Sequence, residues 1–164
     1  IDAYQDWVSE EPKNLVVIPY ISMHGSTKEM VDHLTSALIA RGVAVELFNL
    51  AVTDIGKLAT TLIDAGTVIL ATPTVLAGPH PLVAYAAILA NALRPKARFA
   101  SVIGSYGWGG KSVETLVSLM PNLKAKIIEP KLCKGRPNQD AKESLEAIAE
   151  EVANQHKEAA LPDR

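Results

Sequence analysis

The sequence predicts an α/β domain built on a doubly wound, five-stranded parallel sheet with helices on both faces. Five short apolar runs rich in β-branched residues alternate with five helix-like segments, and this alternation is typical of successive strand–helix units. Most of the runs are continuously apolar, as expected of strands covered on both faces. The length of 164 residues suits one domain with a substantial core. The expected strand order is 2-1-3-4-5.

The expected strands lie at 15–21, 43–48, 67–71, 99–104 and 125–130. Pro19 has no backbone N–H to donate within a central strand, so we place it near the end of the first strand or at a bulge. The expected helices carry apolar residues at spacings of three and four, or end at a glycine, and lie at 27–42, 54–66, 80–94, 111–120 and 139–157. We divide the chain into a linker or residual upstream segment (1–13), the domain (14–158) and a C-terminal tail (159–164).

Composition excludes several classes of protein. Sixteen basic and 18 acidic residues give a net charge of -2, and no basic block indicates a nucleic-acid surface. No apolar run reaches the roughly 18 residues that a membrane span needs. The single cysteine, Cys133, cannot form an internal disulfide, which fits a reducing compartment and predicts a cytoplasmic protein.

In such a sheet, ligands bind outside the carboxyl ends of the strands, where the strand order reverses. The loop after the first strand supplies the candidates Ser22, Met23, His24, Gly25, Ser26 and Thr27. Its hydroxyls, its glycine and the N-terminus of the following helix suit a phosphate. A competing interpretation is a capping box in which the Ser26 side chain accepts from the Glu29 amide. His24 either contacts the ligand, faces solvent or packs against the protein.

The loop after the third strand supplies Pro73, Thr74, Val75, Leu76, Ala77 and Gly78. Prolines stiffen this loop, and Gly78 permits unusual backbone angles. Its apolar residues lie in a connector that is normally polar, which indicates either a flat apolar ligand or packing against a neighbouring loop.

The loop after the fourth strand supplies Ser105, Tyr106, Gly107, Trp108, Gly109 and Gly110. Aromatic side chains between glycines can stack on a planar ring, and glycines let amide groups approach a ring carbonyl. At this edge of the sheet we favour stacking over a packing role.

Three related patterns are rejected. A phosphate-binding P-loop fails because Gly104 lies one residue too far from Gly110-Lys111-Ser112. A dinucleotide fingerprint would need a glycine or alanine where Ser112 stands. A response-regulator receiver would need an aspartate where the chain has Thr72-Pro73.

The segments "SMHGST", "TPT" and "GSYGWGGK", followed by "KGRPNQDAKESLEAIAEEVA", resemble the flavodoxin-like domain of flavodiiron proteins, also called A-type flavoproteins. The resemblance covers residues 14–156 and implies FMN as the cofactor. By this resemblance the range 22–27 holds the phosphate. The ranges 73–78 and 105–110 line the two sides of the isoalloxazine, with Tyr106 or Trp108 against the ring.

Flavodiiron proteins also carry an upstream metallo-β-lactamase-like domain that binds two irons. This chain has no H-x-E-x-D cluster, so reduction of oxygen or nitric oxide is not ascribed to it alone, and no metal ligand is expected. The resemblance implies an electron-transfer domain that serves a di-iron centre on another domain and has no catalytic acid or base. The implied donors are a rubredoxin-like protein, a flavin reductase or a deazaflavin coenzyme, and the family's dimers imply a homodimer.

Two alternatives remain. One is a free-standing flavodoxin-like electron carrier, although such carriers tend to be strongly acidic. The other is a flavodoxin-like fold that has lost its flavin and serves for interaction only.

Overall fold

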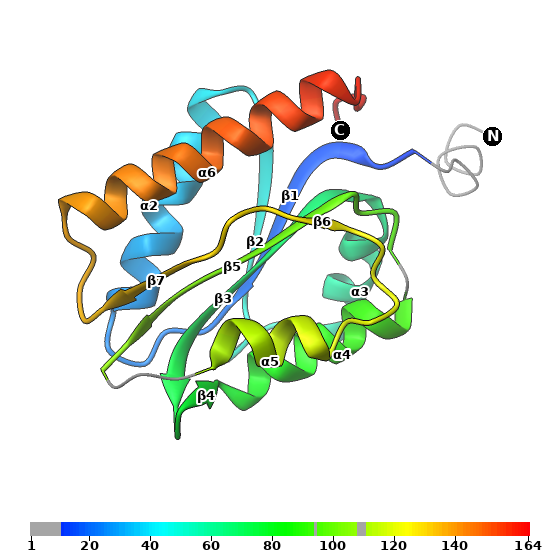
Figure 1. Ribbon diagram of the computed structural model, residues 1–164. Coiled ribbons are helices and arrows are strands. Elements are labelled where there is room, and N and C mark those ends of the chain that lie inside the picture. The colour runs from blue at the N-terminus through cyan, green and yellow to red at the C-terminus, as the bar shows by residue number, and fades with distance from the viewer. Residues whose placement is uncertain (1–10, 94, 108–110) are drawn as a thin grey trace.

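A computed structural model of the chain describes residues 11–93, 95–107 and 111–164. Its centre is a parallel sheet (Figure 1) of β1 (Lys13–Tyr20), β2 (Ala44–Asn49), β3 (Ala65–Val75), β5 (Phe99–Tyr106) and β6 (Lys126–Ile127), in the order β2-β1-β3-β5-β6. Two short strands extend it: β4 (Gly78–Pro79) runs antiparallel to the end of β3, and β7 (Lys131–Lys134) pairs with β5. With β6 and β7 counted as one interrupted strand, the predicted order 2-1-3-4-5 is confirmed.

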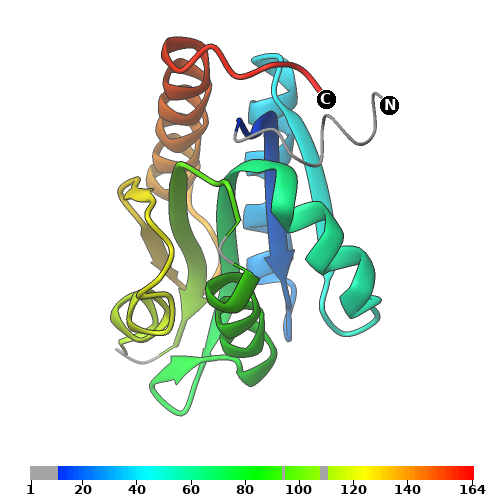
Figure 2. The ribbon, with the colours of Figure 1, turned by 90° about the vertical axis from the view of Figure 1, so that its right-hand side faces the viewer.

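Helices cover both faces of the sheet (Figures 1 and 2). One face carries α2 (Ser26–Ala40) and α6 (Gln139–Glu158), and the other carries α3 (Ile55–Asp64), α4 (Pro81–Leu93) and α5 (Ser112–Ser118). Alternate residues of a strand point to opposite faces. Accordingly, Val16 and Ile18 join the core under α2 and α6, whereas Leu15 and Val17 join the core under the other three helices. The predicted doubly wound architecture is confirmed.

Pro19 lies one residue before the end of β1, opposite Phe48 of β2. The prediction that it stands near the strand's end is therefore correct. Ladder bonding resumes directly after it, because the Ile21 amide donates to the Ala71 carbonyl at 3.3 Å.

The fifth strand differs from the prediction of a single strand at 125–130. It forms β6 and β7 with an unpaired stretch between them that contains Pro130, which has no N–H for a ladder. Ile128 still bonds to the Ala100 carbonyl at 2.8 Å and is buried. Neither β4 nor β7 is predicted from the sequence.

The helix starts follow ordinary capping chemistry. The Asp54 side chain accepts from the Gly56 amide ahead of α3, and the Asn138 side chain accepts from the Ala141 amide ahead of α6, both at 2.9 Å. Proline stands at the first position of α4, where its missing N–H costs no hydrogen bond. None of the helices described is long and apolar enough to cross a membrane.

A buried histidine links the two ends of the domain. His156 of α6 is 3% exposed, and its Nε2 lies 2.6 Å from the Thr67 hydroxyl of β3. Its Nδ1 lies 2.9 Å from Asn14 Oδ1 of β1. Because Oδ1 only accepts, Nδ1 carries the proton and Nε2 accepts from Thr67. The Asn14 backbone amide donates to the Pro162 carbonyl at 2.7 Å, and its side-chain Nδ2 donates to the Asp163 carboxylate at 3.0 Å, so residues after α6 pack against β1.

Burial lowers the pKa of His156 to about 4. The unfolded chain binds this proton near pH 6.5 and the folded chain only near pH 4. We therefore expect the free energy of unfolding to fall by about 2 to 3 kcal/mol as the pH drops from 7 to 4. Urea denaturation across this range measures the change. A His156→Gln variant should lack this component of the pH dependence, and an equal slope in both proteins would contradict the assignment.

Candidate functional site

A cavity of about 380 Å³ opens at the carboxyl ends of the central strands. It is bounded by the loop after β1, by the last residues of β3, and by the end of β5 with the residue that follows it. These belong to the three segments in which the sequence predicts the site. Of the predicted site residues, the structure places around it Met23, His24, Ser26, Thr27, Pro73, Thr74, Val75, Ser105, Tyr106 and Gly107. The volume lies within the range of small-molecule sites.

The start of α2 differs from the predicted capping box. Ser26 is the first helical residue, and Gly25 is the N-cap with φ +90° and has no side chain to cap the helix. The Glu29 amide donates to the Gly25 carbonyl at 2.9 Å and not to the Ser26 side chain. The capping box is therefore wrong, and the reason is the left-handed turn at Gly25, which moves the cap one residue earlier.

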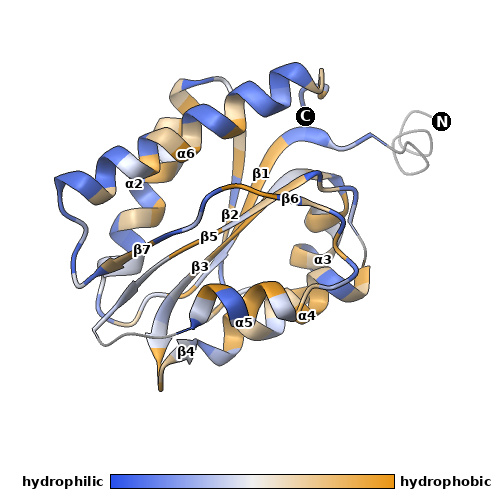
Figure 3. Cartoon of the chain, viewed as in Figure 1, coloured by the Kyte–Doolittle hydropathy of each residue, from blue (hydrophilic) through white to orange (hydrophobic). Residues whose placement is uncertain are grey.

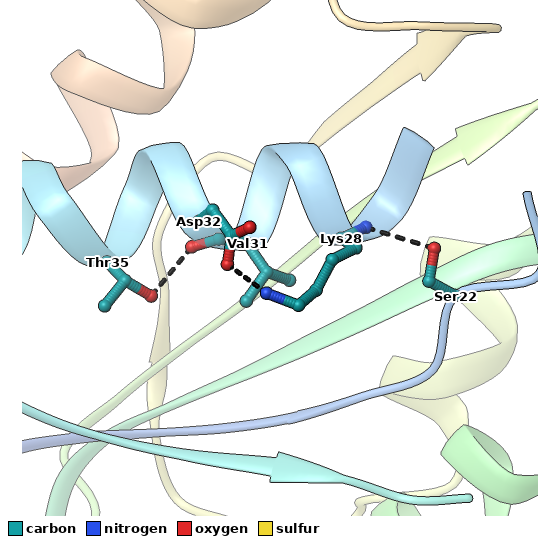
Figure 4. Close-up of polar contacts among 5 residues, drawn as sticks. All are labelled: Ser22, Lys28, Val31, Asp32 and Thr35. Atoms are coloured by element: carbon teal, nitrogen blue, oxygen red, sulfur yellow. Dashed lines mark hydrogen bonds and ion pairs between the residues drawn. The ribbon is translucent and has the colours of Figure 1, made fainter. Parts of the chain in front are cut away.

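Ser22 organises this turn instead. Its hydroxyl accepts from the Gly25 and Lys28 amides, each at 3.2 Å, and Figure 4 shows the contact with Lys28 beside the Lys28–Asp32 ion pair. Within the described part of the chain, the amides of Ser26 and Thr27 have no hydrogen-bond partner. Both residues line the cavity. Two unpaired N–H groups at a helix N-terminus can bind an anion.

The loop after β3 is a tight hairpin. Val75 pairs with Gly78, and the two residues between them, Leu76 and Ala77, have φ values of 49° and 65°. Positive φ at both central positions is the pattern of a type I′ turn, which asparagine and glycine normally supply. The predicted unusual backbone at Gly78 is therefore wrong: the turn falls on Leu76 and Ala77 because Gly78 belongs to β4.

This strained turn is held from two sides. The Lys111 amide donates to the Ala77 carbonyl at 3.0 Å, and the Thr72 hydroxyl accepts from the His80 amide at 2.9 Å. Leu76 is fully exposed at the tip, whereas Val75 lines the cavity. Of the predicted residues in this loop, Leu76, Ala77 and Gly78 do not line the cavity, and neither do Ser22 and Gly25 of the first loop.

The loop after β5 contributes the aromatic wall. Tyr106 ends β5 and lines the cavity beside Gly107. Trp108, Gly109 and Gly110, also predicted for this site, lie outside the described residues. A buried hydrogen bond ties this loop to the first one, because the hydroxyls of Thr27 and Ser105 lie 3.1 Å apart.

Sequence reasoning missed one lining residue, Gly135. It follows β7, has φ +68°, and donates its amide to the Tyr106 carbonyl at 2.9 Å. Its own carbonyl accepts from the Cys133 thiol at 3.4 Å, and burial raises the pKa of that thiol, which keeps the proton needed for this bond. The "KG" pair before "RPNQD" was a turn signal that could have located Gly135.

The cavity offers little acid–base chemistry. The titratable residues that line it are His24 and Tyr106, and the described residues contain no group of three or more histidine, cysteine or acidic side chains that could hold a metal ion. The arrangement combines an anion position at one end with apolar and aromatic walls, which suits a planar ligand that carries a phosphate.

Known proteins are similar to this chain in structure and in sequence. No family model matches the chain. A nitric oxide reductase of Moorella thermoacetica is 33% identical over 78% of the chain and 32% of its own length. The solved rubredoxin oxygen:oxidoreductase of Desulfovibrio gigas superimposes with a TM-score of 0.88 at 29% identity, over 95% of this chain and 39% of that one. A flavodiiron protein from Giardia intestinalis gives 0.82 at 22% identity, over 98% and 41%.

A flavodoxin from the domain Archaea gives a TM-score of 0.75 at 17% identity, over 87% of this chain and 99% of the flavodoxin. The chain is a flavodoxin-like domain related to the flavodiiron proteins. The predicted fold and resemblance are confirmed, and the relationship supports a redox domain of the FMN type. This flavodoxin-like domain spans about a third of the length of the curated relatives it matches.

The turn at Leu76 and Ala77 is left-handed. This conformation costs about 1 to 2 kcal/mol for a residue with a side chain, and asparagine and glycine adopt it more readily. We expect a Leu76→Asn/Ala77→Gly double variant to raise the free energy of unfolding by about 1 kcal/mol, measured by urea denaturation. The control is Val52→Asn, at an exposed site without positive φ. Equal stabilities of the two variants would contradict the strain.

Proposed function

We propose that this flavodoxin-like domain binds FMN in the cavity and passes electrons from a reduced carrier to a di-iron centre on another domain. The observation that carries the proposal is the pair of unpaired amides of Ser26 and Thr27, which open into the same cavity as the wall formed by Val75 and Tyr106. A phosphate and an apolar ring therefore find complementary surfaces at one site.

The phosphate would lie at the N-terminus of α2. The unpaired amides and the partial positive charge of the helix end favour an anion without an arginine. Ser22 fixes the turn by accepting hydrogen bonds from two amides, so contacts within the chain hold the cradle in shape. Gly25 is required because its φ of +90° suits a residue without a side chain.

The ring would lie between the β3 hairpin and the β5 loop. Pro73 and Val75 present apolar surface from one side, and Tyr106 presents an aromatic ring from the other. The Thr27–Ser105 hydrogen bond fixes the distance between phosphate loop and ring loop. The predicted contacts through Met23, His24 and Thr74 belong to the same proposal, since these residues also line the cavity.

FMN bound in the cavity would supply the redox chemistry, namely the capacity to take up two electrons and give them up one at a time. The chain's own residues bind and orient the cofactor and keep water from its faces. None of the described residues that line the cavity is acidic, which is consistent with this task, because electron transfer needs no positioned acid or base.

The relatives favour a module over a free-standing carrier. The curated relatives are about three times as long as the chain's match to them, and their names describe nitric oxide and oxygen reduction. The oxygen oxidoreductase is named for rubredoxin, so a rubredoxin-like protein is the donor we favour over a flavin reductase or a deazaflavin coenzyme. The lone buried thiol fits a reducing compartment such as the cytoplasm.

Titration with FMN and with riboflavin, which lacks the phosphate, tests the site. We expect the wild type to bind FMN at least tenfold more tightly than riboflavin. The quenching of flavin fluorescence on binding gives both dissociation constants. Ser22→Ala should weaken FMN about tenfold and leave riboflavin unchanged, because only the phosphate cradle is disturbed. Tyr106→Leu should weaken both ligands about three- to tenfold.

Two matched variants serve as controls. Ser144→Ala removes a hydroxyl that bonds only within α6, and Tyr85→Leu removes an exposed tyrosine on α4; neither residue lines the cavity. Equal affinity for the two ligands in the wild type would overturn the phosphate cradle, and a protein that binds neither would overturn the function.

A further inference from the structure

Another cavity lies at the opposite end of the sheet from the proposed flavin site. It has a volume of about 460 Å³, and residues of two connections line it, 95–98 ahead of β5 and 121–124 ahead of β6. Both connections therefore lie at the amino ends of the strands, away from β4 (Figure 1). No residue lines both this cavity and the flavin site. Its volume lies within the range of small-molecule sites.

The lining of this cavity is strongly basic. Lys96, Arg98 and Lys124 bring three positive charges to it, and none of the described residues that line it is acidic. The whole chain has a net charge of -2, so this concentration of positive charge runs against the overall balance. Figure 3 shows hydrophilic residues on both connections. Like charges held near one another repel, and an anion between them would lower that energy.

Two of the three cations have no counter-ion within the described part of the chain. Arg98 and Lys124 are exposed, and their side chains make no hydrogen bond or ion pair with it. Lys96 Nζ lies 3.5 Å from Asp64 Oδ1, which is longer than a strong charge-assisted hydrogen bond. Asp64 does not line the cavity. An anion that enters therefore meets Arg98 and Lys124 without having to displace a partner from the described residues.

Hydrogen bonds hold the backbone of both connections. The Arg98 amide donates to the Gly66 carbonyl of β3 at 3.0 Å, and the Arg98 carbonyl accepts from the Lys126 amide of β6 at 2.9 Å. The Asn122 amide donates to Asn91 Oδ1 of α4 at 2.7 Å. Because these contacts tie both connections to the sheet and to α4, a ligand would have to order side chains but little backbone.

We propose that this cavity binds a small anion that carries two adjacent phosphate groups. A guanidinium can donate two parallel hydrogen bonds to one phosphate, and an ammonium supplies a compact point charge. Arg98 and Lys124 come from different connections, so they can contact two groups of one ligand. Asn122 adds an uncharged amide to the lining. The cations surround a cavity of limited volume and form no extended stripe, which favours a small anion over a nucleic acid.

Amide chemical shifts of the purified chain, followed by NMR during titration with pyrophosphate, test the proposal. We expect saturable shifts at Lys96, Arg98 and Asn122, with an affinity at least about tenfold higher than for orthophosphate, which offers one phosphate group only. Shifts confined to Ser26 and Thr27 would place the anion in the flavin cavity. That result would overturn this proposal and leave the proposed function intact. Titration with ADP distinguishes an organic source of the diphosphate from an inorganic one, and the proposal holds for either.

Variants test the residues at constant ionic strength, because salt screens exposed charges. Arg98→Gln and Lys124→Gln should each weaken pyrophosphate binding about tenfold, and Arg98→Lys about threefold, since it keeps the charge and loses the fork. The matched control Lys57→Gln removes an exposed lysine of α3 outside the cavity and should leave the affinity unchanged.

Two results would overturn the proposal. One is equal weakening by Lys57→Gln and by Lys124→Gln, because the protein would then respond to net charge and not to a site. The other is a wild type without saturable shifts in the two connections at about 5 mM pyrophosphate, a concentration that would reveal even a weak site. The same spectra report whether each variant is folded.

Discussion

The close packing of β3 against β5 at Thr72 and Gly104 governs the geometry of the site. The two residues pair in the sheet, and a Cβ at Gly104 would lie 2.0 Å from the Thr72 carbonyl. Only glycine allows this approach. Thr72 is fully buried, donates its hydroxyl to the Pro73 carbonyl at 2.8 Å and accepts the His80 amide at 2.9 Å. One residue thus fixes the exit of β3, the entry to α4 and the distance to the aromatic loop.

Parallel pairing carries this constraint to the other loops. Tyr20 lies opposite Ala71, and Pro73 lies opposite Ser105, so β1, β3 and β5 end side by side. The loops that follow them must meet at one edge, whatever their sequences. This explains why the alternation of apolar runs and helices was enough to predict which loops bound the cavity. Hydrophobic pattern determines topology, and topology determines which segments meet.

The sequence could not predict how the backbone turns within those loops. "SMHGSTKE" fits a capping box as well as it fits the turn observed, and only the position of Ser22 relative to Gly25 and Lys28 decides between them. Leu76 and Ala77 have no propensity for positive φ, so contacts from elsewhere impose it. Gly135 reaches the cavity because β7 pairs with the end of β5. The sequence did not predict β7, because the strand is interrupted at Pro130. Each difference arises from long-range contacts that a local pattern does not contain.

The strain at Leu76 and Ala77 bears on how the site would hold a ligand. Strained conformations persist only where the surroundings determine them, and here the Val75–Gly78 pairing and the Lys111–Ala77 hydrogen bond do so. The Ser22 turn and the Thr27–Ser105 bond hold the opposite wall in the same way. Contacts within the chain therefore hold both walls, and a ligand that binds between walls held in this way loses less free energy to ordering them. The left-handed turn lowers the stability of the folded protein, and the ordered site that it helps to form favours ligand binding.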